Sequence, residues 1–288
     1  MADSTRKQFR AMLKPGAALV LPGVANALAA RVASDCGFGA AYVTGAGIAN
    51  TFLGIPDNGL VTVSELTDHV VAIREVFPGP LMVDADTGFG NALNMRRTIQ
   101  TLERAGADAI QIEDQVFPKR CGHFEGKEVI PSAEMVGKIK AAVDARTDPD
   151  LLIVARTDAI AVEGFSAAMD RAHAFREAGA DIGFVEAPLN EAQMTAIARL
   201  AWPQIANIVI GGKTPERPNE QMQRLGFAGI LYANTALQAA LHGMVLALSH
   251  LKQHGQMGDA SAAMLTGFAE RQRLVDIQSF QEMERKYK

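Results

Sequence analysis

The chain has 288 residues, of which 48% are hydrophobic and 21% charged, enough to bury the core of one barrel of about 250 residues or of two domains. Its formal net charge of -4 and isoelectric point near 5.9 exclude the basic surface of a nucleic-acid-binding protein, and no apolar stretch is long enough for a membrane span. Small anionic ligands would therefore need cations placed locally.

The N-terminal residues do not resemble a targeting signal. MADSTRKQFRAMLKPG is mixed polar without an apolar centre, and the later run AALVLPGVANALAARVA is interrupted by Pro22, Asn26 and Arg31. A cytoplasmic location is therefore expected. The two cysteines cannot form a disulfide framework, and Cys36, in SDCGFGAAYV, is predicted to be a small buried residue before a strand.

A helix-to-strand joint recurs along the chain. In the four segments SDCGFGAAYV, ERAGADAIQI, REAGADIGFV and QRLGFAGILY, a helix end gives way to a glycine suited to left-handed backbone and then to a short apolar run. Eight runs of strand length are predicted, at residues 18–24, 40–46, 81–86, 109–114, 151–158, 182–187, 207–212 and 229–234. The segments between them, such as NMRRTIQTLERAG and SAAMDRAHAFREAG, have the apolar spacing of helices.

The order of these elements predicts the fold class. Nearly continuous apolar strands that alternate with helices indicate a parallel sheet covered on both faces. Eight such units favour an α/β fold of the (β/α)8 barrel, or TIM, type over an open doubly wound sheet. Because no linker, low-complexity tract or charge block divides the chain, residues 1–288 are predicted to form a single domain.

Two glycine-containing segments follow predicted strands. YVTGAG, residues 42–47, offers a hydroxyl group and backbone amides, so Thr44, Gly45 and Ala46 are predicted to hold a carboxylate. TGFGNALNMRRT, after Asp86, lacks the GxGxxG and Walker patterns of nucleotide sites. It is interpreted as a turn that brings backbone amides near the site.

Polar residues stand where the predicted strands end, which is the catalytic face of such a barrel. LMVDAD ends in Asp84 and Asp86, whose spacing in an extended backbone places both carboxylates on one side. The seventh strand begins with Asn207. The later strand ends carry Glu113, Asp114, Arg156, Asp158 and Glu186. Single acidic residues at such positions also cap helices or face solvent, and Asp114 and Asp158 are candidates for that role.

Carboxylates that converge on one barrel mouth would repel one another unless a cation lay among them. Hard oxygen ligands at a partly open site are typical of Mg2+ or Mn2+ with several waters retained. Zinc is not expected, because Cys121 and His123 have no second cysteine or histidine pair at ligand spacing.

The segment FPKRCGHFEGK, residues 117–127, places Cys121 two residues from His123 and among Lys119, Arg120 and Lys127. Its composition is compatible with a metal site, a nucleophile, a proton donor or a charged loop.

Five motifs, VDADTGFGN, QIEDQ, PKRCGHFEGK, VARTDA and GGKTP, together resemble the isocitrate lyase and phosphoenolpyruvate mutase superfamily over nearly the whole chain. The resemblance implies Mg2+ at the barrel mouth, a mobile loop that carries the cysteine, and 2-oxo or 2-hydroxy diacid substrates. It also implies a homotetramer, a dimer of helix-swapped dimers, in which a C-terminal helical extension, residues 245–288, is exchanged between barrels.

The resemblance also implies roles for individual residues. Asp84 matches the direct metal ligand, and Asp86 and Glu113 match carboxylates that hold the metal mainly through water. The catalytic positions are Cys121, Arg156, Glu113 and His123, where Arg156 matches the arginine that binds the substrate's carboxylate and oxygen. The substrate-binding positions are Thr44, Gly45, Ala46, Asp57, Gly122, Glu186 and Asn207.

The chemistry implied by this resemblance gives the cysteine a specific role. Cleavage of a 2-hydroxy diacid needs a base for the hydroxyl proton, a cation for the alkoxide that becomes a carbonyl, and an acid for the released enolate. Cys121 is predicted to be that acid, because a thiol pKa of about 8.5 lies near neutrality and Lys119, Arg120 and His123 would tune it. A nucleophilic thiolate is the alternative.

Differences between this sequence and the methylisocitrate lyases narrow the range of expected substrates. Their serine and arginine after the last strand correspond to Thr235 and Gln238, and a glutamate before GGKTP corresponds to Ile210. The missing cation favours a dicarboxylate, such as a substituted malate, over a tricarboxylate. The predicted function is a Mg2+-dependent carbon–carbon lyase. The alternatives are a phosphonopyruvate mutase or hydrolase, which Cys121 argues against, and an oxaloacetate hydrolase or decarboxylase.

Overall fold

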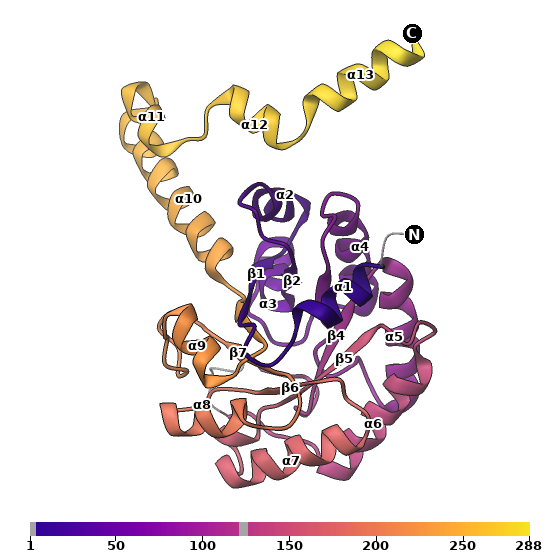
Figure 1. The fold of residues 1–288 in the computed structure, drawn as a ribbon. Helices are drawn as coiled ribbons and strands as arrows, with labels where there is room; N and C mark the ends of the chain where they lie inside the picture. The colour runs from indigo at the N-terminus through magenta and orange to yellow at the C-terminus, as the bar shows by residue number, and fades with distance from the viewer. Residues whose placement is uncertain (1–3, 121–125) are drawn as a thin grey trace.

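A closed barrel of eight parallel strands forms the centre of the computed structural model, which describes residues 4–120 and 126–288. The strands follow one another around the barrel in sequence order, and β1 closes it by pairing with β8. Figure 1 shows helices around the barrel and a C-terminal tail that extends away from it. The predicted (β/α)8 barrel is confirmed.

The strands lie close to the predicted apolar runs, with one exception. Their bounds are β1 (Leu19–Val24), β2 (Ala41–Val43), β3 (Leu81–Asp84), β4 (Ala109–Glu113), β5 (Leu152–Thr157), β6 (Ile182–Val185), β7 (Gln204–Asn207) and β8 (Gly229–Tyr232). The prediction for β7 was wrong, because Asn207 ends this strand instead of beginning it. The apolar residues that suggested a later strand, such as Ile208 and Val209, follow it, and Val209 lines a cavity at the barrel mouth.

Helices connect the strands and cover the outside of the barrel (Figure 1). Their bounds before the tail are α1 (Thr5–Met12), α2 (Ala27–Asp35), α3 (Gly45–Ile48), α4 (Val63–Arg74), α5 (Ala92–Ala105), α6 (Ser132–Ala145), α7 (Phe165–Glu177), α8 (Glu191–Ala198) and α9 (Asn219–Leu225). Short π- and 3-10 helices, η1 (Ala49–Leu53) and η2 (Ala159–Ala161), complete the set. Gly106 and Gly226 cap α5 and α9 in the left-handed conformation, as the repeated joint predicted.

The apolar core has two parts. Inside the barrel, side chains such as Leu21, Met82 and Val154 pack together, and Phe9 and Leu13 of the α1 region join them. The larger cluster lies outside, between the strands and the surrounding helices. Phe9 is completely buried, so the α1 region contributes directly to the barrel interior.

Cys36 differs from its prediction. It is exposed, at the C-terminal end of α2. The small buried residues on either side of this joint are Ala33 and Ala40, so the apolar positions are taken by alanine and the thiol faces outward.

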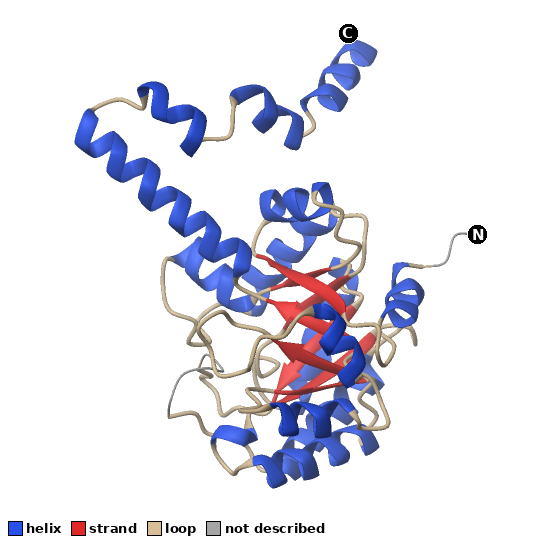
Figure 2. Cartoon of the chain, turned by 60° about the vertical axis from the view of Figure 1, so that its left-hand side comes forward, coloured by secondary structure: helices blue, strands red, loops and turns tan. Residues whose placement is uncertain are grey.

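The C-terminal tail consists of α10 (Thr235–His254), η3 (Gly258–Ala260), α11 (Ser261–Met264), α12 (Phe268–Leu274) and α13 (Ile277–Tyr287). Figure 2 shows α10 leading from the barrel to the shorter helices. No residue of these tail helices is buried. Residue 245, the expected start of the extension, lies within α10. Across the described chain, no helix combines the length and apolarity needed to cross a bilayer.

Candidate active site

Polar side chains meet in a small cavity of about 40 Å³ at the C-terminal ends of the strands. The lining residues come from β2, β3, β5, β6, β7, β8, the loops after them and the segment after β4. They are Tyr42, Thr44, Ala46, Asp57, Asp84, Lys119, Arg156, Phe184, Glu186, Asn207, Val209, Leu231, Ala233 and Asn234. The strand ends thus bring together most of the described residues that the sequence placed in a site.

The turn after β2 approaches the acidic side of this cavity. Thr44 is the N-cap of α3, and its Oγ1 accepts a hydrogen bond from the Gly47 amide at 3.2 Å. The Gly45 amide donates to Asp84 Oδ2 at 3.4 Å. A Cβ on Gly45 would lie 3.1 Å from that oxygen and 3.3 Å from Asp86 Oδ1, so glycine permits the close approach of backbone and carboxylates.

Asp84 is held by a chain of buried hydrogen bonds that sequence reasoning missed. Tyr42 Oη donates to Gln111 Oε1 at 3.0 Å, and Gln111 Nε2 donates to Asp84 Oδ1 at 3.1 Å. Burial, followed by the charge of Asp84, raises the pKa of Tyr42 well above its ordinary value, so Tyr42 remains a neutral donor. The signal in the sequence was alternation, because Gln111 precedes Glu113 by two residues within an apolar strand.

Asp86 and Asp57 share one lysine. Lys119 Nζ lies 2.6 Å from Asp57 Oδ1 and 3.0 Å from Asp86 Oδ1. Burial raises the pKa of Asp86 to about 6 although Lys119 opposes it. Burial also lowers the pKa of Lys119, but Asp86 and the other carboxylates outweigh burial and raise it well above its ordinary value. β3 itself ends at Asp84, and Asp86 has a φ of 47°, so a turn and not an extended strand orients the second carboxylate.

Arg156 lies between two carboxylates and an aromatic ring. Its Nε is 3.4 Å from Glu113 Oε2, and its guanidinium carbon is 5.1 Å from the centre of the Phe184 ring. Burial raises the pKa of Glu113 well above its ordinary value. Glu113 Oε1 is buried and has no hydrogen-bond partner in the described part of the protein. This oxygen is therefore available to a ligand or to a metal-bound water.

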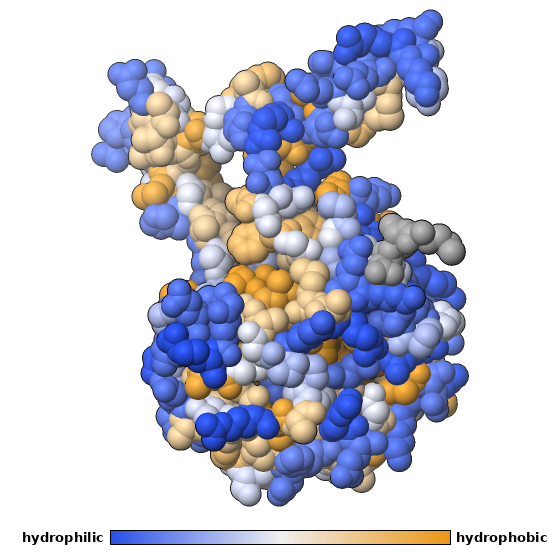
Figure 3. Space-filling model, viewed as in Figure 1, coloured by the Kyte–Doolittle hydropathy of each residue, from blue (hydrophilic) through white to orange (hydrophobic). Residues whose placement is uncertain are grey.

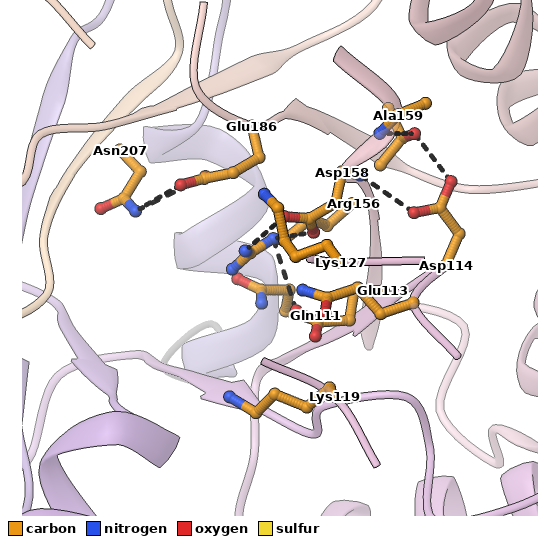
Figure 4. Close-up of polar contacts among 12 residues, drawn as sticks. Gln111, Glu113, Asp114, Lys119, Lys127, Arg156, Asp158, Ala159, Glu186 and Asn207 are labelled. Carbon is orange, nitrogen blue, oxygen red and sulfur yellow. Dashed lines mark hydrogen bonds and ion pairs between the residues drawn. The ribbon is translucent and has the colours of Figure 1, made fainter. Parts of the chain in front are cut away.

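Asp158 is the second carboxylate beside Arg156. It accepts hydrogen bonds from Arg156 Nε at 2.9 Å and Nη2 at 3.1 Å, and from Lys127 Nζ at 2.8 Å. Figure 4 shows these three side chains together, with Lys119 at a separate position. The alternative interpretation of Asp158, a solvent-facing residue, was wrong, because the residue is almost completely buried.

Asp114 forms hydrogen bonds that connect elements of the fold. It accepts hydrogen bonds from Thr157 Oγ1 at 2.7 Å, from the Asp158 amide at 2.9 Å and from Arg171 Nη1 at 3.2 Å. Arg171 Nη1 also donates to the Ile130 carbonyl at 2.9 Å. Asp114 therefore joins β4, β5 and α7 behind the site instead of facing the cavity.

Glu186 and Asn207 form the opposite side of the cavity (Figure 4). Asn207 Nδ2 donates to Glu186 Oε1 at 3.2 Å. Asn207 Oδ1 is buried and, within the described residues, accepts no hydrogen bond. This pair can therefore offer a carboxylate and an amide oxygen to hydroxyl groups of a ligand.

Three predicted site residues, Cys121, Gly122 and His123, lie outside the described residues. Of the segment that carries them, the structure describes residues 116–120 and 126–128. The Gln115 side chain binds the Arg120 backbone through hydrogen bonds of 2.9 Å to both its amide and its carbonyl. Gln115 also forms an antiparallel bridge with Val129, which closes the base of this segment.

The acidic residues suit a cation that keeps most of its waters better than one enclosed by protein ligands. No three aspartate, glutamate, histidine or cysteine side chains come together as a metal cluster among residues 4–120 and 126–288. Asp84 and Asp86 nevertheless both border Gly45, and Glu113 Oε1 lacks a partner in the described chain. This donor set fits Mg2+, which binds through one or two carboxylates and keeps several waters.

Comparison with known proteins places this geometry in a family. The family model of phosphoenolpyruvate phosphomutase matches residues 9–252. The chain belongs to the phosphoenolpyruvate phosphomutase family. It is 41% identical to 2,3-dimethylmalate lyase from Eubacterium barkeri over 285 residues, which cover 99% of this chain and 98% of the relative. It is 44% identical to 2-methylisocitrate lyase from Aeropyrum pernix over 252 residues, covering 87% and 81%.

Solved structures of this family share the whole fold. Oxaloacetate acetylhydrolase in complex with the inhibitor 3,3-difluorooxalacetate superposes with a TM-score of 0.92 at 30% identity, covering 99% of this chain and 97% of the other. Phosphonopyruvate hydrolase in complex with oxalate and Mg2+ superposes with a TM-score of 0.89 at 28% identity, covering 99% of both. The phosphoenolpyruvate phosphomutase family therefore includes lyases, mutases and hydrolases, and this chain is an enzyme of that superfamily.

Proposed function

We propose that the protein is a Mg2+-dependent lyase that cleaves a 2-hydroxy dicarboxylate of the substituted malate type to a 2-oxo acid and a carboxylic acid. The observation that carries this proposal is the position of Arg156 beside the Asp84 and Glu113 side of the barrel mouth. The sequence gives further support, because the chain is 41% identical to 2,3-dimethylmalate lyase over almost the full length of both chains.

The acidic side of the cavity is assigned to the metal. Asp84 would hold Mg2+ directly, and Asp86 and Glu113 would hold its waters. When bound, Mg2+ supplies positive charge to the oxygen that changes from alkoxide to carbonyl. The presence of Mg2+ and oxalate together in the related phosphonopyruvate hydrolase supports this assignment.

The substrate is held by residues of the protein itself. Arg156 pairs with a carboxylate and with the neighbouring oxygen, and the turn at Gly45 and Ala46 receives the second carboxylate. Glu186 and Asn207 orient the hydroxyl group. Cys121 is assigned as the acid that protonates the enolate of the departing carboxylic acid, because its S–H can transfer a proton near neutral pH.

Apolar residues of the cavity favour a substituted malate. Phe184, Val209 and Leu231 line it together with the polar groups, and they suit alkyl substituents of the substrate better than a third carboxylate. Thr235 and Gln238, which replace the serine and arginine of methylisocitrate lyases, lie exposed in the first turn of α10. The cavity is instead lined at this point by Ala233 and Asn234.

The C-terminal tail is assigned to contacts between subunits, in a homotetramer built from two helix-swapped dimers. Large apolar residues of α10 such as Leu241, Met244 and Leu248 are more than half exposed. Figure 3 shows hydrophobic residues on the tail and on the part of the barrel that faces it. Leu28 of α2, which is 53% exposed, adds to the apolar surface of the barrel. A helix with this much exposed apolar surface requires a partner surface, and exchange of residues 245–288 supplies it.

The test is a substrate panel with and without a chelator. Purified protein is incubated with 2,3-dimethylmalate, 2-methylisocitrate, oxaloacetate and phosphonopyruvate, and release of 2-oxo acid or consumption of oxaloacetate is followed. We expect turnover of the substituted malate, loss of turnover with EDTA and recovery with Mg2+ or Mn2+. Turnover of phosphonopyruvate or oxaloacetate alone, or full activity after exhaustive chelation, would contradict the proposal.

A further inference from the structure

A buried ion pair joins the segment after β4 to the end of β5. Lys127 Nζ lies 2.8 Å from Asp158 Oδ1, and the two side chains are 1% and 0% exposed. Such a pair adds little net stability, because the cost of removing two charges from water opposes their attraction. Its position suggests another role, because Asp158 is also the main partner of Arg156.

Asp158 divides its charge between two cations. Its Oδ2 accepts from Arg156 Nε at 2.9 Å, while its Oδ1 accepts both from Arg156 Nη2 at 3.1 Å and from Lys127 Nζ at 2.8 Å. Burial raises the pKa of Asp158, but Arg156 and Lys127 outweigh burial and hold it below its ordinary value, so this side chain is a carboxylate. Figure 4 shows the lysine and the arginine converging on it.

Arg156 would bind an anion poorly without the lysine. Two carboxylates, Asp158 and Glu113, lie beside its guanidinium group, at 2.9 Å and 3.4 Å from Nε. At low dielectric, the negative charge of Asp158 offsets the attraction of a single arginine for a substrate carboxylate. Lys127 brings a second positive charge to Asp158 and, unlike Arg156, does not line that cavity.

We propose that Lys127 is a positioning residue that acts on Arg156 through Asp158. By pairing with Asp158 Oδ1, Lys127 neutralises the carboxylate that orients the guanidinium group, and it leaves the positive charge of Arg156 to a carboxylate in the cavity. This inference rests on the proposed function in one respect, that the anion bound at Arg156 is a diacid.

The test uses oxalate as the probe, with Mg2+ present, and measures its affinity by calorimetry. Lys127→Met leaves the Asp158 charge uncompensated beside Arg156, so we expect oxalate to bind at least about tenfold more weakly. The double variant Lys127→Met with Asp158→Asn removes that charge as well, so affinity should return to within about threefold of the original protein. Glu128→Gln, an exposed neighbour in the same segment, is the matched control and should not change affinity.

Recovery in the double variant separates action through Asp158 from a structural role of Lys127. A structural role predicts that the two substitutions each weaken binding and that their effects add, and that result would overturn the inference. Lys127→Arg keeps the charge and gives a second measurement, in which affinity within about fivefold supports the inference and a loss like that of Lys127→Met overturns it.

Failure of the proposed function can be distinguished from failure of this inference. If the unsubstituted protein binds oxalate but cleaves no 2-hydroxy diacid, the function is wrong while the coupling between Lys127 and Asp158 is still decided by the double variant. If the unsubstituted protein binds no oxalate, the inference is overturned as well.

Discussion

Lys119 offers a direct test of how the barrel mouth balances its negative charges. Its ammonium group lies 2.6 Å from Asp57 Oδ1 and 3.0 Å from Asp86 Oδ1, and its side chain is 4% exposed. Lys119→Met removes this charge and keeps a flexible side chain of similar length. The two carboxylates would then face each other without a protein cation, so the metal-free variant should be less stable.

The size of the effect follows from the burial of the pair and the length of the chain. Removing one partner of a buried ion pair costs about 3–5 kcal/mol. At about 2.1 cal/mol/K per residue, unfolding of 288 residues has an entropy of about 0.6 kcal/mol/K, so Tm should fall by about 5–8 °C. A cation that binds only the folded protein adds about 2.7 kcal/mol at a hundred times its Kd, equivalent to about 4–5 °C.

Mg2+ should therefore stabilise the variant more than the original protein, because in the variant it supplies the charge that Lys119 no longer provides. Each tenfold gain in Mg2+ affinity adds about 1.4 kcal/mol, or about 2 °C, to the shift in Tm. The measurement is thermal unfolding of both proteins in EDTA and in excess Mg2+.

Lys140→Met serves as the control, because Lys140 is an exposed lysine of α6. Its Tm should stay within about 1 °C of the original under both conditions, as is usual for surface substitutions. The reasoning is refuted if Lys119→Met has an unchanged Tm in EDTA, or if Mg2+ raises its Tm less than that of the original protein.

The core, the loop and the tail allow three further tests. Phe9→Ala should lower the free energy of unfolding by about 3–5 kcal/mol in denaturant titrations, because Phe9 is fully buried. The kcat should be unchanged, and a loss of kcat without a loss of stability would contradict this prediction. Cys121→Ser should lower kcat by about a hundredfold or more with little change in oxalate affinity, because serine is a much weaker acid, and a near-normal kcat would exclude the thiol as proton donor. Leu248→Glu should give smaller species in light scattering, because it places a charge on the apolar surface of α10, whereas an unchanged assembly would argue against exchange of the tail.

Much of the barrel was predictable because local sequence signals, such as a glycine at a helix end followed by an apolar run, mark where strands begin. Gly106 and Gly226 occupy left-handed helix ends, and a short apolar strand follows each one. The prediction of β7 was wrong because its polar and apolar residues do not mark the bounds of the strand. Gln204 begins that strand as a buried polar residue, while the apolar residues after Asn207 lie beyond the strand. Hydrophobicity alone could not distinguish residues that pack in the sheet from residues that line the cavity.

The site was predictable in position but not in its pairings. Asp84, Glu113 and Arg156 could be placed at one face because the C-terminal ends of parallel strands meet there. Other charged partners in the site, such as Lys119 and Lys127, come from loops, whose paths depend on contacts distant in the sequence. Asp158, for example, pairs with a lysine 31 residues away. The sequence places Lys119 and Lys127 near Cys121, but it does not show which carboxylates these lysines bind.

The two buried lysines of the segment after β4 explain how so many carboxylates can share one barrel mouth. Lys119 binds Asp57 and Asp86 on one side, and Lys127 binds Asp158 on the other. Each places its charge where burial would otherwise favour protonation of the carboxylates over their charged form. Because both cations belong to one short stretch of chain, the charge at the metal side and the charge beside Arg156 depend on the same segment. Substitutions that displace residues 116–120 or 126–128 should therefore change metal affinity and diacid affinity together, whereas Lys119→Met should change mainly metal affinity and Lys127→Met mainly diacid affinity.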